Sequence, residues 1–242
     1  MRGFRVLVGT WACGVAMTAA AQAADPAGTW NPLPDFIKPH RTELISGWYV
    51  RGDLGYSQPS IGSVDVPRPQ IVTRWNLQSS PTLGGGAGYK YQWFRADVTV
   101  DYANRGKFQG DTAAVRSYYT AKLDSFTVLA NVYLDLGTWA GFTPYVGAGV
   151  GTSHLRTHEY TNITIQEPQY SVTDSTRWNL SWAAMGGIAF RFSPNLLIDV
   201  GYRYLTLGDA VSGTEPPLYT SRSYFRDIKA QEIRVGLRWM LD

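Results

Sequence analysis

The stretch WNLSWAAMGGIAFRF, residues Trp178–Phe192, alternates between two kinds of side chain over its whole length. Its even-numbered positions are mostly apolar or aromatic, and its odd-numbered positions are mostly small or polar. Successive side chains of a β-strand point to opposite faces of a sheet, so this pattern predicts a strand with one apolar and one polar face.

The same alternation recurs in seven further stretches, which brings the number of predicted strands to eight. These stretches are residues 47–57, 82–91, 94–103, 126–135, 145–152, 196–205 and 233–241. A soluble sandwich of two sheets would alternate in the same way, with its polar faces in water. Alternation alone therefore leaves a soluble sandwich and a membrane barrel open.

The lengths of the connectors favour the barrel. Three connectors are short: 92–93, 136–144 and 193–195. Four are long and polar: 58–81, 104–125, 153–177 and 206–231. Short turns at one end and long loops at the other are typical of an outer-membrane barrel with both termini in the periplasm. We expect the four long connectors to be loops, the third of which continues two strands beyond the membrane as a protruding hairpin.

The apolar faces predict contact with lipid. A sheet in hydrocarbon cannot leave its edge N–H and C=O groups unpaired, so it must close on itself. Aromatic residues lie mainly at the ends of the apolar rows, as expected where rings sit at the two membrane interfaces. The predicted interface aromatics are Trp48, Tyr56, Tyr89, Tyr91, Phe94, Tyr102, Trp178, Trp182, Phe190, Phe192, Tyr202, Tyr204 and Trp239.

The opposite faces carry charges of both signs. The predicted interior network is Arg51, Asp53, Arg95, Asp97, Asp101, Asp199, Arg203, Glu232 and Arg234, with Lys90, Asp135, Arg191 and Arg238 on the same faces. An eight-stranded barrel has an interior about wide enough for side chains to fill. Because buried charges need partners, we expect an ion-pair plug. In the alternative, many of these charges lie near the barrel mouths in water.

Two groupings of these charges are plausible from the sequence. The first joins Arg95 and Asp97 with Arg191, and the second joins Asp199 with Arg203 and Arg234.

The N-terminal segment has the order of a secretory signal peptide. Arg2 and Arg5 precede an apolar run, and Ala21-Gln22-Ala23 follows it, so we expect cleavage after Ala23. Residues 24–45 contain four prolines and read as an irregular periplasmic lead, and residues 46–242 form the barrel. The chain is therefore expected in the outer membrane of a Gram-negative cell.

The sequence carries little chemistry of an enzyme. The formal charge is +3 with no basic cluster, so nucleic acid is not an expected partner. Ser153, His154, His158 and Glu159 form the single suggestive cluster, but two histidines are a weak metal signal. A hydrolytic triad there is disfavoured because adjacent strand residues diverge. We expect no catalytic residue, metal or cofactor.

Several segments resemble the opacity-type outer membrane proteins, including the surface antigens of alphaproteobacteria. The matching segments are Tyr49–Ser57 (YVRGDLGYS), Pro144–Gly151 (PYVGAGVG), Gly201–Tyr204 (GYRY) and Arg234–Trp239 (RVGLRW). The resemblance implies a role in envelope integrity, surface recognition or adhesion. It also implies contact with barrel-insertion machinery through the last strand, although this chain ends in Leu241-Asp242, where such chains end in an aromatic residue.

The leading hypothesis is a non-enzymatic barrel with a largely plugged interior that contacts outer membrane lipid and lipopolysaccharide and binds a surface or host ligand through long loops. The alternatives are a narrow porin-like diffusion channel for small solutes and a lipid A-modifying hydrolase. The sequence leaves the oligomeric state open.

Overall fold

The described part of the computed structural model comprises residues 46–65, 72–112, 117–164, 170–171, 174–213 and 222–241. The predicted signal peptide and the whole of the predicted periplasmic lead lie outside these residues. No helix in this part of the chain is long and apolar enough to cross a membrane.

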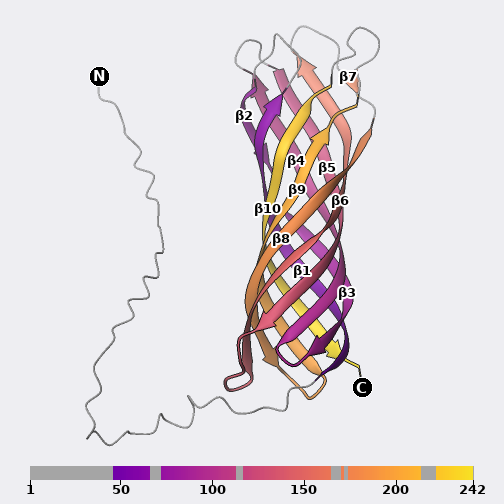
Figure 1. Ribbon diagram of the computed structural model, residues 1–242. Helices are drawn as coiled ribbons and strands as arrows, with labels where there is room; N and C mark the ends of the chain where they lie inside the picture. The colour runs from indigo at the N-terminus through magenta and orange to yellow at the C-terminus, as the bar shows by residue number, and fades with distance from the viewer. Residues whose placement is uncertain are drawn as a thin grey trace, which may run out of the picture. The chain divides into compact units, whose positions relative to one another are not determined.

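The chain forms a closed antiparallel barrel of eight strands (Figure 1). The wall consists of β1 (Gly47–Asp65), β3 (Ser80–Tyr91), β4 (Phe94–Thr112), β5 (Ser117–Asp135), β6 (Phe142–Thr164), β8 (Ser175–Arg191), β9 (Leu196–Val211) and β10 (Tyr224–Met240). Each strand pairs with the next in the chain, and the pairing of β1 with β10 closes the wall. The soluble sandwich is thereby excluded and the predicted fold is confirmed.

Two short strands extend the wall at the end opposite the C-terminus. β2 (Val72–Leu77) pairs with β4 above the end of β3, and β7 (Tyr170–Ser171) pairs with β6 above the end of β8. The protruding hairpin expected in the third long connector is therefore present.

The prediction that the other long connectors are loops was wrong for much of their length. β1 continues to Asp65, β4 to Thr112, and β10 begins at Tyr224. At a rise of about 3.3 Å per residue and a tilt of about 40°, the 23 residues of β6 reach about 58 Å along the barrel axis. The apolar band of such barrels is about 25 Å tall, so the wall rises well beyond the membrane.

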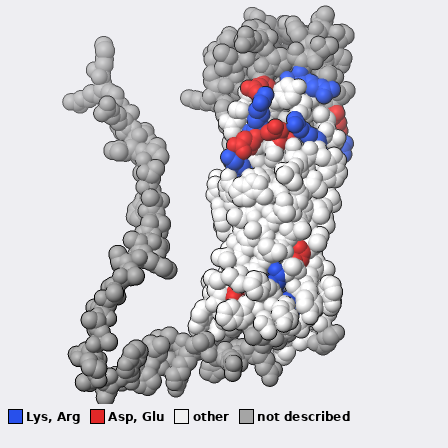
Figure 2. Space-filling model, in the orientation of Figure 1, with Lys and Arg blue, Asp and Glu red and all other residues white. Residues whose placement is uncertain are grey.

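The outer face of the barrel is divided into two zones. Figure 2 shows charged side chains gathered toward the extracellular end, above a broad surface that almost lacks them. The uncharged zone carries exposed apolar side chains such as Leu54, Val98, Val146, Val200 and Leu237. This zone is the lipid-facing band.

The structure places the predicted interface aromatics on the outer face of the wall. Twelve of the thirteen are exposed, and Tyr204 is half-buried. Trp48 and Tyr89 pack edge to face at the periplasmic end, with ring centroids 5.3 Å apart. Trp182 and Tyr204 lie 5.7 Å apart toward the other end.

Candidate functional site in the barrel interior

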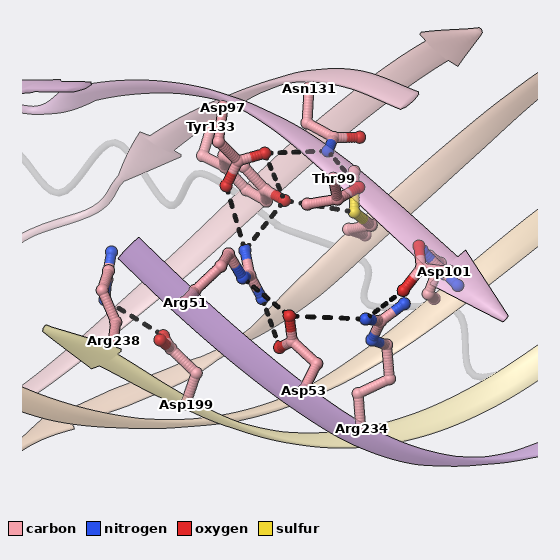
Figure 3. A network of polar contacts seen from close by, with 12 residues as sticks. Arg51, Asp53, Asp97, Thr99, Asp101, Asn131, Tyr133, Asp199, Arg234 and Arg238 are labelled. Atoms are coloured by element: carbon pink, nitrogen blue, oxygen red, sulfur yellow. Dashed lines mark hydrogen bonds and ion pairs between the residues drawn. The ribbon is translucent and has the colours of Figure 1, made fainter. Parts of the chain in front are cut away.

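The interior of the membrane-spanning part holds buried charged side chains from opposite sides of the wall. Strand alternation sends odd-numbered residues of β1, β4, β5 and β9 inward, together with even-numbered residues of β10 from Met240 to Ala230. All nine residues of the predicted interior network line this space, and Figure 3 shows most of them. Eight are buried and Arg51 is half-buried.

The first group of ion pairs is centred on Arg203. Its guanidinium lies 2.6 Å from Asp101 Oδ2 and 2.6 Å from Glu232 Oε2. Arg234 Nη2 lies 2.6 Å from the other oxygen of Asp101 and 3.4 Å from Asp53. This group joins β4, β9, β10 and β1 across the barrel.

The second group is centred on Arg51 and Asp97. Arg51 donates two hydrogen bonds to Asp53, at 2.9 and 2.7 Å, and one to Asp97 at 3.1 Å. Asp97 also accepts hydrogen bonds from the hydroxyl of Tyr49 at 3.0 Å and the amide of Asn131 at 2.8 Å. The carboxylate is thus held by two strands besides its own, β1 and β5.

The third group lies nearest the periplasmic end. Arg95 donates to Asp135 at 2.8 Å, and Lys90 binds the other oxygen of the same carboxylate. Arg238 lies 3.0 Å from Asp199. The Arg95 guanidinium also sits 4.7 Å from the ring centre of Tyr133, where cation–π attraction operates.

The formal charges of these three groups cancel. Six cations (Arg51, Lys90, Arg95, Arg203, Arg234 and Arg238) face six anions (Asp53, Asp97, Asp101, Asp135, Asp199 and Glu232). Isolated buried charge is costly, whereas paired charge with hydrogen bonds is tolerated.

The partners differ from the groupings expected from the sequence. Asp97 pairs with Arg51, Arg95 with Asp135, and Asp199 with Arg238. Arg191, expected beside Arg95, forms no ion pair within the described ranges. Strand tilt brings residues of distant strands to one level, and the shear that sets this level cannot be read from single strands.

A small cavity lies among these groups. It measures about 20 Å³ and is lined by Arg51, Asp53, Tyr145, Arg203 and Arg234, among others. This volume holds about one water molecule. Nitrogens of Arg95, Arg234 and Arg238 in this region have no hydrogen-bond partner in the described protein, so buried water is expected beside them.

Above the charged groups, the interior becomes apolar. A cluster of hydroxyl side chains marks the transition, in which Ser153 bonds Thr127 at 2.9 Å and Ser181 at 2.7 Å. The apolar core beyond it comprises Leu77, Leu123, Leu129, Leu155, Ala183, Leu205, Leu207, Ala210, Phe225, Ile228 and Ala230. We call this the extracellular core.

At the height where the interior becomes apolar, the outer face of the wall becomes polar. Along β10, exposed Leu237, Val235 and Ile233 give way to Gln231 and Lys229. The inward positions of β10 change from Arg and Glu to Ala230 and Ile228. The upper wall therefore has an apolar interior and a polar outer face, as in a soluble barrel. The lower wall has a charged interior and an apolar outer face, as in a membrane barrel.

Residues of the suggestive sequence cluster do not converge. Ser153 is fully buried inside the barrel, whereas His154 stacks on Trp178 on the outside, with ring centroids 4.7 Å apart. The side chain of Glu159 lies outside the described part of the structure. Among the described residues, no group of three or more His, Cys, Asp or Glu side chains could hold a metal ion.

Comparisons with known proteins agree with the fold. A family model described as "Outer membrane protein beta-barrel domain" matches residues 11–240. The outer membrane protein PagN of Salmonella typhimurium is 30% identical over 182 residues, which cover 67% of this chain and 75% of PagN. The 25 kDa outer-membrane immunogenic protein of Brucella abortus is 24% identical over 247 residues, which cover 98% of each chain.

Among solved structures, the crystal structure of Neisserial surface protein A shares the fold. Its TM-score is 0.55 at 17% identity, and the match covers 81% of this chain and 98% of that chain. The match of the family model over most of the sequence, together with the closed barrel, establishes membership and location. This chain belongs to the outer membrane protein beta-barrel family and resides in the outer membrane of a Gram-negative bacterium.

Proposed function

We propose that this barrel is a non-enzymatic outer membrane protein that does not conduct ions and that presents its extracellular end for contacts at the cell surface. We also propose a role in envelope integrity. The observation that carries the proposal is the two-zone interior, with balanced ion pairs inside the membrane and the extracellular core above them.

The charged zone opposes conduction because its charges hold each other. A passing ion would have to displace contacts such as Arg203–Asp101 and Arg234–Asp101, both at 2.6 Å. Removing one partner of a buried ion pair typically costs about 3–5 kcal/mol. Thermal fluctuation rarely supplies this energy.

The extracellular core is a second barrier in series with the first. Leu155, Leu205, Leu207 and Ile228 are at most 1% exposed. Apolar constrictions of this kind exclude water and therefore ions.

The same core supports a display function. An upper wall with its own packed core holds the extracellular connections at a fixed height above the lipid surface, because core packing resists deformation. One relative is named an outer-membrane immunogenic protein, which supports exposure of such a surface to the outside. The ligand, whether on a host or on another cell, would bind at this end.

A second candidate function is a narrow diffusion channel. The one-water cavity and the unpaired guanidinium nitrogens favour it, because they require water within the charged zone. A channel would also need a wet path through the extracellular core.

Single-channel conductance in planar bilayers separates the two functions. The refolded protein, shown to be folded by a heat-shift gel, is expected to be silent. A variant with Leu155, Leu205 and Leu207 changed to serine tests the extracellular core, and one with Arg203→Ala and Arg234→Ala tests the charged zone. Stable current steps from the unaltered protein would refute closure and support the channel.

The hydrolase alternative has its own test. Because Ser153 is enclosed and His154 points away from it, Ser153→Ala is expected to leave lipid A chemistry in the cell unchanged. Altered lipid A acylation in that variant would contradict a non-enzymatic role.

A further inference from the structure

The wall above the membrane is not hydrogen-bonded around its whole circumference. The ladder between β8 and β9 ends at the pair formed by Ala183 and Leu205. Above this pair, β8 extends to Ser175 and stays paired with β6, its neighbour on the other side. β9 extends to Val211 and stays paired with β10. The upper wall is therefore split along a seam between β8 and β9.

A second seam lies between β1 and β2. β1 is paired with β3 only up to Ser57, and its upper part, which reaches Asp65, lies next to β2. β2 is paired with β4, but within the described ranges no ladder joins it to β1. The upper part of β1 is paired with β10 alone, up to Asp65. The upper wall thus consists of two separate sheets.

We call these two sheets the leaves. The five-stranded leaf comprises β2 and the upper parts of β4, β5, β6 and β8, and the three-stranded leaf comprises the upper parts of β9, β10 and β1. Below the two seams the ladder is closed, and the three groups of interior ion pairs all lie in this closed part. Both leaves are therefore rooted in one closed barrel.

Side chains bridge the seam between β8 and β9 in place of a ladder. The hydroxyl of Thr206 accepts a hydrogen bond from the amide of Trp182 at 3.1 Å and donates one to the carbonyl of the same residue at 3.2 Å. The side-chain amide of Asn179 donates to the carbonyl of Asp209 at 2.8 Å. Three hydrogen bonds to side chains thus hold this seam over a stretch where a continuous ladder would supply backbone bonds.

The extracellular core lies between the two leaves. Strands of the five-stranded leaf supply Leu77, Leu123, Leu129, Leu155 and Ala183, and strands of the three-stranded leaf supply Leu205, Leu207, Ala210, Phe225, Ile228 and Ala230. Burial of this apolar surface is the main force that holds the leaves together. Their contact can separate and form again without the loss of a ladder bond in either leaf.

The three-stranded leaf also has an irregular backbone just above its root. The register between β9 and β10 shifts on both sides of Ile228. Gly208 and Asp227 have positive φ angles of 80° and 55°. The amide of Asp227 donates to the carboxylate of Asp209 at 3.0 Å. Because β-bulges bend a strand locally, this level is a bending point between the leaf and the closed barrel.

We propose that the upper wall is a clamp. The three-stranded leaf swings away from the five-stranded leaf along both seams and exposes the extracellular core, while the membrane-spanning barrel stays closed. The closed clamp is the major state, because opening gives up the burial of the core.

Thiol labelling of the refolded protein tests the clamp. The single cysteine of the chain, Cys13, lies in the predicted signal peptide, so a cysteine introduced into the barrel is the sole thiol once that segment is removed. Ala210→Cys places a thiol on the three-stranded leaf, where Ala210 is 1% exposed. Leu77→Cys places one on β2, beside the other seam, where Leu77 is 7% exposed. A charged, water-soluble maleimide reaches these two sites readily only when the core is exposed.

Thr206→Val loosens the seam between β8 and β9, because it removes both hydrogen bonds between Thr206 and Trp182. We expect it to speed the labelling of both thiols by the same factor, about tenfold, as expected for two hydrogen bonds. The equal factor is the decisive result, because Leu77 lies beside the seam that this substitution leaves intact. Asn179→Ala, a second variant at the same seam, is expected to speed both reactions in the same way.

Thr152→Val is the matched control. The hydroxyl of Thr152 also donates to the backbone of β8, at 3.0 Å from the carbonyl oxygen of Asn179, but this bond lies within the five-stranded leaf. Its loss is expected to leave both labelling rates unchanged. Ala189→Cys, where Ala189 is 1% exposed at the periplasmic end, reports on general loosening of the barrel and should react slowly in every background. The heat-shift gel checks the folding of each variant.

Several results would overturn the clamp. Faster labelling at residue 210 alone would show local fraying at one seam, and faster labelling at residue 189 would show that the whole barrel loosens. Equal effects of Thr152→Val and Thr206→Val, or unchanged rates in both Thr206→Val and Asn179→Ala, would also refute it. Because the charged zone stays closed when the leaves separate, silence or current in the conductance experiment does not decide whether the clamp opens.

Discussion

Replacement of Arg203 by leucine tests whether the interior charges stabilise one another. Arg203 is 3% exposed and contacts both Asp101 and Glu232 at 2.6 Å. Its loss leaves six anions facing five cations. Asp101 keeps Arg234 at 2.6 Å, but Arg234 approaches Glu232 only to 3.8 Å. Because Asp101 keeps a close partner, we expect a loss of about 3 kcal/mol in unfolding free energy, at the low end of the usual range for a broken buried ion pair.

The assay is urea unfolding of the refolded barrel in lipid vesicles, followed by tryptophan fluorescence and the heat-shift gel. A loss of about 3 kcal/mol corresponds to more than a hundredfold change in the unfolding equilibrium. The double variant Arg203→Leu/Glu232→Leu restores five charges of each sign, so it should be clearly more stable than the single variant. A single variant within about 0.5 kcal/mol of the unaltered protein, or a double variant that is less stable still, would refute the reasoning.

Two further predictions concern the wall and the extracellular core. Leu155→Ala should lower the unfolding free energy by about 2–5 kcal/mol, because Leu155 is 1% exposed in the extracellular core. It should also speed amide hydrogen exchange in the upper halves of β5, β6 and β8. Val146→Ala, on the lipid face, is the control, and equal exchange in the two variants would contradict the existence of a separate upper core. Gly187→Ala should reduce the folded yield, because the new methyl group would meet the carbonyl oxygen of Val200 and the Cα of Gly201, the latter at 2.7 Å. No atom lies within 4 Å of the position that a new methyl group would take at Gly52, so Gly52→Ala should fold normally. A comparable folded yield from both glycine variants would show that the wall shifts to accommodate the methyl group at residue 187.

The residues that define the two faces of each strand were predictable from the sequence. Asp199 and Arg203 share one parity on β9 while Val200 and Tyr202 share the other, and only one register keeps the charges out of lipid. The same parity assigns Tyr49, Tyr133 and Tyr145 to the interior, although aromatic rings in such barrels are expected mainly at the membrane interfaces. All three are at most 7% exposed and contact the charged groups.

The extent of the strands was not predictable in the same way. In the upper wall, inward positions such as Leu123 and Leu155 are apolar and outward positions such as Asp124 and Arg156 are charged. This alternation is the inverse of the membrane-spanning pattern. Because its outward residues are charged and not apolar, the sequence of the upper wall resembles a polar loop. Ion-pair partners were also beyond reach, because Asp101 and Arg234 are separated by 133 residues and meet only through the curvature of the closed wall.

The reversal of polarity between the lower and upper wall determines how deeply the barrel lies in the membrane. If the barrel sank toward the periplasm by one pair of residues along β10, Gln231 and then Lys229 would enter hydrocarbon. If it rose by the same step, Ile233 would be left in water. Either displacement is opposed by the outward side chains of β10, so these residues favour one depth of the barrel in the membrane and one height of its extracellular end.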